Sequence, residues 1–253
     1  MLGGRRASMV GREALRPRNY RALARMARVY PRPAEAARRY FLGKGPYPYA
    51  CPVRTPAGVV APTIHSSHDM FTVNEVFCRE DYAAAAEIRT VVDVGSNIGI
   101  SALYFLTRSP ATRVRLYEPV PRNVERLRAN LAGYEERWTL REAAVAAAPG
   151  RVTFGVEDSG RYGGIGVSTG STIEVEAVAI DSVLEEALAE ADRIDVLKID
   201  TEGTELELLA AVRPDLLERV RVVFLETERR SAPPLPSFSA TFRNDTLVLR
   251  NAA

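Results

Sequence analysis

A segment in the middle of the chain, Val91-Val92-Asp93-Val94-Gly95-Ser96-Asn97-Ile98-Gly99, joins an apolar run to a turn that contains two glycines. Such a turn can bring backbone N–H groups close to a ligand, because glycine lacks a Cβ atom and accepts a positive φ. We expect Gly95 to allow this approach, Asn97 to accept a positive φ, and Gly99 to let the following helix pack tightly on the strand. Asp93, Gly95, Ser96, Asn97 and Gly99 are therefore candidate ligand-binding residues, and the alternative is a plain connection between a strand and a helix.

A second candidate, Glu118, ends the next apolar run, Leu116-Tyr117-Glu118-Pro119, 25 positions after Asp93 (118 − 93). In Rossmann-like folds, an acidic side chain at the tip of the second strand accepts hydrogen bonds from ribose hydroxyls. Pro119 ends the strand, so the carboxylate is expected to face the crevice. Ala143, after the third predicted strand, is assigned to the same site. The alternative for Glu118 is a solvated loop carboxylate.

The densest group of ionisable residues is Asp195-Val196-Leu197-Lys198-Ile199-Asp200-Thr201-Glu202-Gly203-Thr204-Glu205. Lys198 and Asp200 share one face of the predicted strand. Ligands bind outside the carboxyl ends of such strands, so the acids at the strand ends should converge there, namely Asp93, Glu118, Asp200, Glu202 and Glu226. Repulsion among carboxylates raises the pKa of one of them and creates a candidate general base. We expect Asp200 or Glu202 to act as a base or to orient a substrate, and Lys198 to tune this edge, whereas Glu205 fits a helix cap.

Two histidines, His65 and His68, stand beside Asp69 ahead of these motifs. They could belong to a metal site, supply a catalytic base from a lid, or make structural hydrogen bonds. No third ligand stands nearby in the sequence, so metal is not favoured there, and His68 is the better candidate for a base. Because hard cations prefer carboxylates, a divalent ion on Asp200 and Glu202 is left open.

The elements that must position these residues alternate between strands and helices in the second half of the chain. This alternation is typical of an α/β fold with a mostly parallel sheet and helices on both faces. Strands are predicted at 90–94, 114–117, 138–142, 152–156, 172–180, 192–200 and 220–225, helices at 98–108, 121–131 and 203–211, and an exposed loop at 159–171. The segment 240–250 predicts an antiparallel hairpin that turns at Asn244-Asp245.

The first 70 residues depart from this pattern and form a predicted accessory segment, with the α/β domain at 71–253. Between Arg5 and Tyr40, the spacing of apolar residues predicts one or two amphipathic helices broken at Pro31 and Pro33. The prolines between 43 and 62 predict a linker or a short β-ribbon. We expect this segment to cover a substrate or to make an oligomer contact.

The composition fits a globular protein, since the 253 residues are 46% hydrophobic. The formal net charge of +2 gives no strong field toward nucleic acid or an anionic membrane. Cys51 and Cys78 lack a metal-ligand spacing and fit ordinary thiols of a reducing compartment. Because no apolar run reaches signal-peptide or transmembrane length, we expect a cytoplasmic protein.

Taken together, four segments resemble the FkbM family of methyltransferases. They are the glycine turn, the Glu118-Pro119 step, Ala179-Ile180-Asp181-Ser182-Val183-Leu184, and Lys198-Ile199-Asp200-Thr201-Glu202-Gly203-Thr204-Glu205. The resemblance covers about 71–226. It implies a Rossmann-like class I methyltransferase fold, S-adenosylmethionine as the donor with S-adenosylhomocysteine as the product, and O-methylation of polyketides, sugars or glycans.

Carried over by position, the resemblance places Asp93, Gly95, Asn97 and Gly99 at the methionine end of the donor. It places Glu118 at the ribose. The sequence after Glu226 is short for this family and the arginine-rich start is not part of the shared pattern, so the acceptor pocket is not carried over.

Two other functions compete with methyl transfer. An NAD(P)-dependent oxidoreductase also uses a strand, a glycine turn and an acid, but Gly95-Ser96-Asn97-Ile98-Gly99 lacks the longer Gly-x-Gly-x-x-Gly spacing. A catalytically inactive methyltransferase-like module could instead bind a partner. We expect a small-molecule or glycan acceptor and favour no nucleic-acid partner, and a homodimer is left open.

Overall fold

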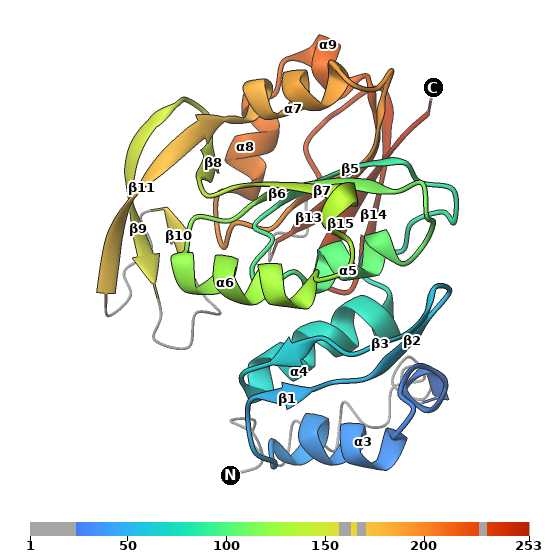
Figure 1. The fold of residues 1–253 in the computed structure, drawn as a ribbon. Coiled ribbons are helices and arrows are strands. Elements are labelled where there is room, and N and C mark those ends of the chain that lie inside the picture. The colour runs from blue at the N-terminus through green and yellow to red at the C-terminus, as the bar shows by residue number, and fades with distance from the viewer. Residues whose placement is uncertain (1–23, 157–162, 166–170, 228–231, 253) are drawn as a thin grey trace. The chain divides into compact units, whose positions relative to one another are not determined.

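The computed structural model describes residues 24–156, 163–165, 171–227 and 232–252 (Figure 1). The chain divides into two compact units, Met1–Glu80 and Asp81–Ala253. This division falls later than the predicted boundary at residue 70, because helical structure at Ser67–Val73 and Asn74–Arg79 continues across that position. The roles expected for the two parts remain predictions.

The C-terminal unit is built on a seven-stranded sheet in the order β14-β15-β13-β12-β5-β6-β7. Its strands are β5 (Thr90–Val94), β6 (Arg113–Tyr117), β7 (Trp138–Arg141), β12 (Ile194–Ile199), β13 (Val220–Glu226), β14 (Phe238–Arg243) and β15 (Thr246–Asn251). The five strands from β13 to β7 run parallel, and β15 and β14 form the predicted antiparallel hairpin. The unit therefore has the predicted Rossmann-like class I methyltransferase fold.

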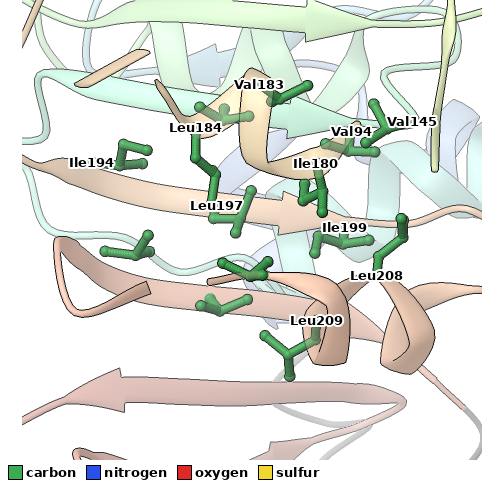
Figure 2. Close-up of a cluster of buried hydrophobic side chains, with 14 of the residues drawn as sticks. Val94, Val145, Ile180, Val183, Leu184, Ile194, Leu197, Ile199, Leu208 and Leu209 are labelled. Carbon is green, nitrogen blue, oxygen red and sulfur yellow. The ribbon is translucent and has the colours of Figure 1, made fainter. Parts of the chain in front are cut away.

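Helices cover both faces of this sheet, with α5 (Ile100–Leu106) and α6 (Pro121–Asn130) on one face and α7 (Ile180–Leu188) and α8 (Glu205–Ala211) on the other (Figure 1). A short helix, α9 (Pro214–Leu217), follows α8. Figure 2 shows Val183 and Leu184 of α7 and Leu208 of α8 over Leu197 and Ile199 of β12. Every residue of β12 is buried, as expected for a central parallel strand covered on both faces.

A second, four-stranded sheet has the order β10-β9-β11-β8. Its strands are β8 (Ala144–Ala146), β9 (Gly150–Val156), β10 (Gly163–Ile165) and β11 (Ser171–Ala179). Strands β9 and β11 were predicted, but β8 and β10 were not. The exposed loop predicted at 159–171 is wrong at 163–165, where β10 pairs with β9, and most of its other residues lie outside the described part.

The described part of the N-terminal unit begins at residue 24. A helix at 24–29 is followed by α3 (Pro33–Leu42), so the predicted break between helices is confirmed there, while residues before 24 lie outside the description. The proline-rich segment forms β1 (Tyr49–Ala50), which pairs with β4 (Thr63–Ile64), and the hairpin of β2 (Val53–Thr55) and β3 (Gly58–Val60), which confirms the ribbon. Helix α4 (Ser67–Val73) then runs into the π-helix η1 (Asn74–Arg79).

Both cysteines are buried free thiols, as predicted, and burial raises the pKa of Cys51 and of Cys78 to about 12. Among the residues described, no helix has the length and apolar character needed to cross a membrane.

Candidate functional site

An open pocket lies at the carboxyl ends of β5, β6 and β12. This is where open α/β sheets bind ligands. The predicted site residues that line it are Gly95, Asn97, Glu118, Pro119, Ala143, Asp200 and Glu202. The other lining residues are Val94, Tyr117, Val120, Asn123, Ala144, Val145, Phe154, Val156, Ile165 and Thr201. Most of the predicted site is therefore brought together around one pocket.

Gly95 is held where no other residue fits. Its φ is 77°, and a Cβ atom would lie 1.8 Å from the carbonyl oxygen of Asp200. The turn is fixed on both sides, because the N–H groups of Gly95 and Ser96 donate to the carbonyl oxygen of Tyr117 at 3.0 and 3.1 Å, and that of Asp200 donates to Val94 at 3.1 Å. The close approach seen at Gly95 is to the backbone that follows β12, and the approach to a ligand stays a prediction.

The other turn residues have different tasks. Asn97 has a φ of 47°, as predicted, and its N–H points at Glu118. Ser96 is buried, and its hydroxyl donates to the carbonyl oxygen of Asp93 at 2.7 Å, so it braces the turn. Gly99 has a φ of 83°, and a Cβ atom there would press on Leu127 and Leu131 near the end of α6. Gly99 was predicted to let the helix pack on the strand, and this is corrected, because its nearest neighbours are the side chains at the end of α6. Gly99 has a left-handed backbone conformation, so α5 begins after it, at Ile100.

Glu118 is a buried carboxylate with a donor on each oxygen. Oε2 accepts from the N–H of Asn97 at 2.9 Å, and Oε1 accepts from the N–H of Val120 at 3.0 Å and from Nδ2 of Asn123 at 3.3 Å. Only 4% of Glu118 is exposed, which excludes the solvated-loop alternative. Burial raises the pKa of Glu118 to about 7, although the three donors and Lys198 act in the opposite direction.

Asp93 and Lys198 form a buried ion pair on adjacent strands, where the two residues are partners in the register. Lys198 Nζ lies 3.0 Å from Oδ1 of Asp93 and donates to the carbonyl oxygen of Gly95 at 3.0 Å. Burial lowers the pKa of Lys198, but Asp93 and Asp200 outweigh it and hold that pKa above its usual value. Neither Asp93 nor Lys198 is among the residues that line the pocket. The ion pair therefore stabilises the turn through the hydrogen bond from Lys198 to Gly95.

Asp200 reaches the pocket from the end of β12, and its Oδ2 lies 3.4 Å from Lys198 Nζ. Tyr82, which the sequence analysis did not single out, lies beside it. The Tyr82 hydroxyl donates to Oε2 of Glu226 at 2.9 Å and lies 3.5 Å from Oδ2 of Asp200. Glu202 also lines the pocket, with a φ of 59°. Glu226 is not a lining residue, and its carboxylate accepts from the Tyr82 hydroxyl beside Asp200.

Glu205 shapes the loop that carries Asp200 and Glu202. Its Oε1 accepts from the N–H groups of Thr201 at 3.0 Å and Gly203 at 2.8 Å, just before α8. The helix cap predicted for Glu205 is not formed, because Thr204 is the N-cap residue of α8 without a side-chain cap hydrogen bond, and the Glu205 carboxylate instead braces the loop before the helix.

The His65, His68 and Asp69 group belongs to the N-terminal unit. Asp69 closes a capping box with Ser66 at the start of α4 and also accepts from the N–H of His65 at 2.6 Å, so the structural alternative holds for Asp69. The His68 ring lies 6.3 Å from the Phe71 ring between centroids, and its catalytic role stays a prediction. Within the described ranges, no group of three or more His, Cys, Asp or Glu side chains is arranged to hold a metal ion.

The model of the methyltransferase FkbM domain matches residues 93–242, more than half of the chain. The AMB antimetabolite synthetase AmbE of Pseudomonas aeruginosa is 30% identical over 193 residues, which cover 61% of this chain and 9% of that protein. The 31-O-demethyl-FK506 methyltransferase FkbM of Streptomyces tacrolimicus is 27% identical over 69% of this chain and 80% of the relative. The hexuronic acid methyltransferase AglP of Haloferax volcanii is 25% identical over 65% of this chain and 68% of the relative.

The matched range contains the glycine turn, Glu118 and the loop after β12, which together supply much of the pocket wall. It extends past the predicted limit near residue 226 into β14. This chain belongs to the FkbM methyltransferase family.

Proposed function

We propose that the chain is an S-adenosylmethionine-dependent O-methyltransferase that acts on a hydroxyl of a sugar, glycan or polyketide-type natural product. The observation that carries this proposal is the buried Glu118 carboxylate, which lines a pocket beside a glycine turn at the carboxyl edge of the sheet. A ribose with two adjacent hydroxyls is the ligand group that suits a carboxylate at this position.

The rest of the pocket also fits such a donor. Val120, Ala144, Phe154 and Ile165 supply an apolar wall for a purine base. The backbones of Gly95 and Asp200 lie close together, and both residues line the pocket, so their main-chain groups stand beside a bound donor. The names of two relatives, a hexuronic acid methyltransferase and a 31-O-demethyl-FK506 methyltransferase, support an oxygen-rich acceptor.

S-adenosylmethionine, when bound, supplies an electrophilic methyl group, whose bond to sulfur breaks as its bond to the acceptor oxygen forms. The residues of this chain must align that oxygen and take its proton. We assign this task to Asp200 or Glu202, which line the pocket. Lys198 is held protonated by its acidic neighbours, so it positions Asp200 and does not act as the base.

Calorimetric titration with S-adenosylhomocysteine, beside NADH, tests the donor. We expect micromolar binding of the first ligand, no binding of NADH, and loss of binding in Glu118→Ala. Binding of NADH alone would favour an oxidoreductase, and binding of neither ligand would favour an inactive module. A positive result leads to transfer of labelled methyl from S-adenosylmethionine to uronic acids, oligosaccharides and hydroxylated macrolides.

The affinity for S-adenosylhomocysteine should depend on pH through Glu118. A carboxylate accepts from ribose hydroxyls in its ionised form, and a pKa of about 7 leaves that form scarce in acid. Affinity is therefore expected to be full above pH 8 and to fall about tenfold between pH 8 and pH 6. Glu118→Gln, measured by the same calorimetry, should bind weakly with a nearly flat profile. If affinity changed equally with pH in the unmutated protein and in Glu118→Gln, the pH dependence would belong to another titrating group.

A further inference from the structure

Asn123 contributes the one side-chain donor to Glu118 among the described residues. Helix α6 begins at Pro121, so Asn123 lies in its first turn, and only 3% of it is exposed. Its Nδ2 shares Oε1 with the N–H of Val120, while Oε2 is bound by the N–H of Asn97. Asn123 itself also lines the pocket. The carboxylate is thus held between two backbone donors and one amide that a mutation can remove.

We propose that Asn123 is a positioning residue for donor binding, whose amide keeps the Glu118 carboxylate ionised and turned toward the pocket. The inference rests on the proposed function, in which Glu118 receives the ribose hydroxyls. An ionised carboxylate only accepts hydrogen bonds, so each N–H donor stabilises the charged form relative to the protonated one. Two backbone donors alone would leave Oε1 with a single partner on a carboxylate that is only 4% exposed.

The charged groups around Glu118 do not replace the hydrogen bond from Asn123. Lys198 of β12 favours the charged form, while Asp200, Glu202 and Tyr117 line the same pocket without a hydrogen bond to Glu118 in the described structure. Burial already raises the pKa of Glu118 to about 7. Losing one donor therefore changes the ionised fraction within the pH range in which the protein can be assayed.

The test combines two measurements on the full-length chain. Carboxyl-¹³C NMR of glutamate-labelled protein follows the titration of Glu118, whose signal is identified by its absence in Glu118→Gln. Calorimetry follows S-adenosylhomocysteine binding at pH 7 and pH 9. The variants are Asn123→Ala, which removes the donor, and Asn123→Asp, which also adds a like charge. Asn130→Ala is the matched control, because its amide lies on the same helix but donates to the carbonyl oxygen of Ile98.

We expect the midpoint of Glu118 to rise by about one pH unit in Asn123→Ala and by more in Asn123→Asp, and to stay unchanged in Asn130→Ala. With a one-unit shift, binding at pH 7 weakens about fivefold and recovers at pH 9. A purely structural amide would instead weaken binding equally at both pH values.

An unchanged midpoint in both Asn123 variants would overturn the inference while leaving the proposed function intact. Asn123→Asp supplies this answer if the alanine variant does not fold. If the midpoint rises as expected but the unmutated protein does not bind S-adenosylhomocysteine, the proposed function fails, and the role of Asn123 in donor binding fails with it.

Discussion

Replacing Lys198 with methionine is expected to lower the free energy of unfolding by about 3–5 kcal/mol. The substitution keeps a long side chain but leaves the fully buried Asp93 carboxylate without the ammonium group that lies 3.0 Å away. One oxygen of Asp93 still accepts from the Ser101 hydroxyl at 2.6 Å, and this hydrogen bond does not neutralise a charge. Urea denaturation followed by circular dichroism measures the loss.

The matched control is Arg128→Met, which breaks an ion pair with Glu142 whose side chains are both 51% exposed. Solvent screens such a pair, so this loss should stay below about 1 kcal/mol. Combining Lys198→Met with Asp93→Asn should recover part of the stability, because the buried charge is then removed. A loss below about 1 kcal/mol in Lys198→Met would mean that water reaches Asp93 in the variant.

The parts of the fold that the sequence predicted correctly are those with strong local signals. Four of the six residues of β12 are large and apolar, namely Ile194, Val196, Leu197 and Ile199, and the hairpin turn at Asn244-Asp245 has its own local signature. β8 and β10 were missed because three residues are too few to show alternation. Helix α7 was missed although Ile180, Val183, Leu184 and Ala187 carry helical spacing, so there the signal was present in the sequence.

The candidate site divides in the same way. Gly95, Glu118 and Asp200 were predictable, because strand ends and glycine turns mark the binding edge of a parallel sheet. Tyr82 was not, since it meets Asp200 and Glu226 from 118 and 144 positions away in the sequence. Asn123 is only five positions from Glu118 in a helix start, but nothing in the sequence shows that its amide turns back toward the strand.

The pairing of Lys198 with Asp93 shows why side-chain partners are harder to predict than strands. The sequence placed Lys198 and Asp200 on one face of a strand. β12 ends at Ile199, one residue before Asp200, and the two side chains meet at 3.4 Å, but the shortest contact of Lys198 with a carboxylate is to Asp93 on the adjacent strand. That contact depends on the register between β12 and β5, in which Lys198 lies opposite Asp93. Local alternation fixes the face, whereas the register fixes the neighbour.

Gly95→Ala should be the most damaging glycine substitution in the site. A left-handed φ of 77° costs alanine about 1–2 kcal/mol. In addition, its Cβ atom would lie 1.8 Å from the carbonyl oxygen of Asp200, so the turn and the loop after β12 must separate. We expect a total loss of about 3–5 kcal/mol in the free energy of unfolding, measured by urea denaturation. Binding of S-adenosylhomocysteine should also be lost, because both displaced segments line the pocket.

Gly133→Ala separates the two causes, because Gly133 lies in the same unit with a φ of 89° and a Cβ atom there would meet nothing within 4 Å. This variant should lose only the conformational cost of about 1–2 kcal/mol and should bind S-adenosylhomocysteine as the unmutated protein does. The difference between the two variants then measures the contact between the glycine turn and Asp200. Equal losses in stability would show that the chain can move away from the added methyl group, and that the close approach at Gly95 is not required to hold the pocket.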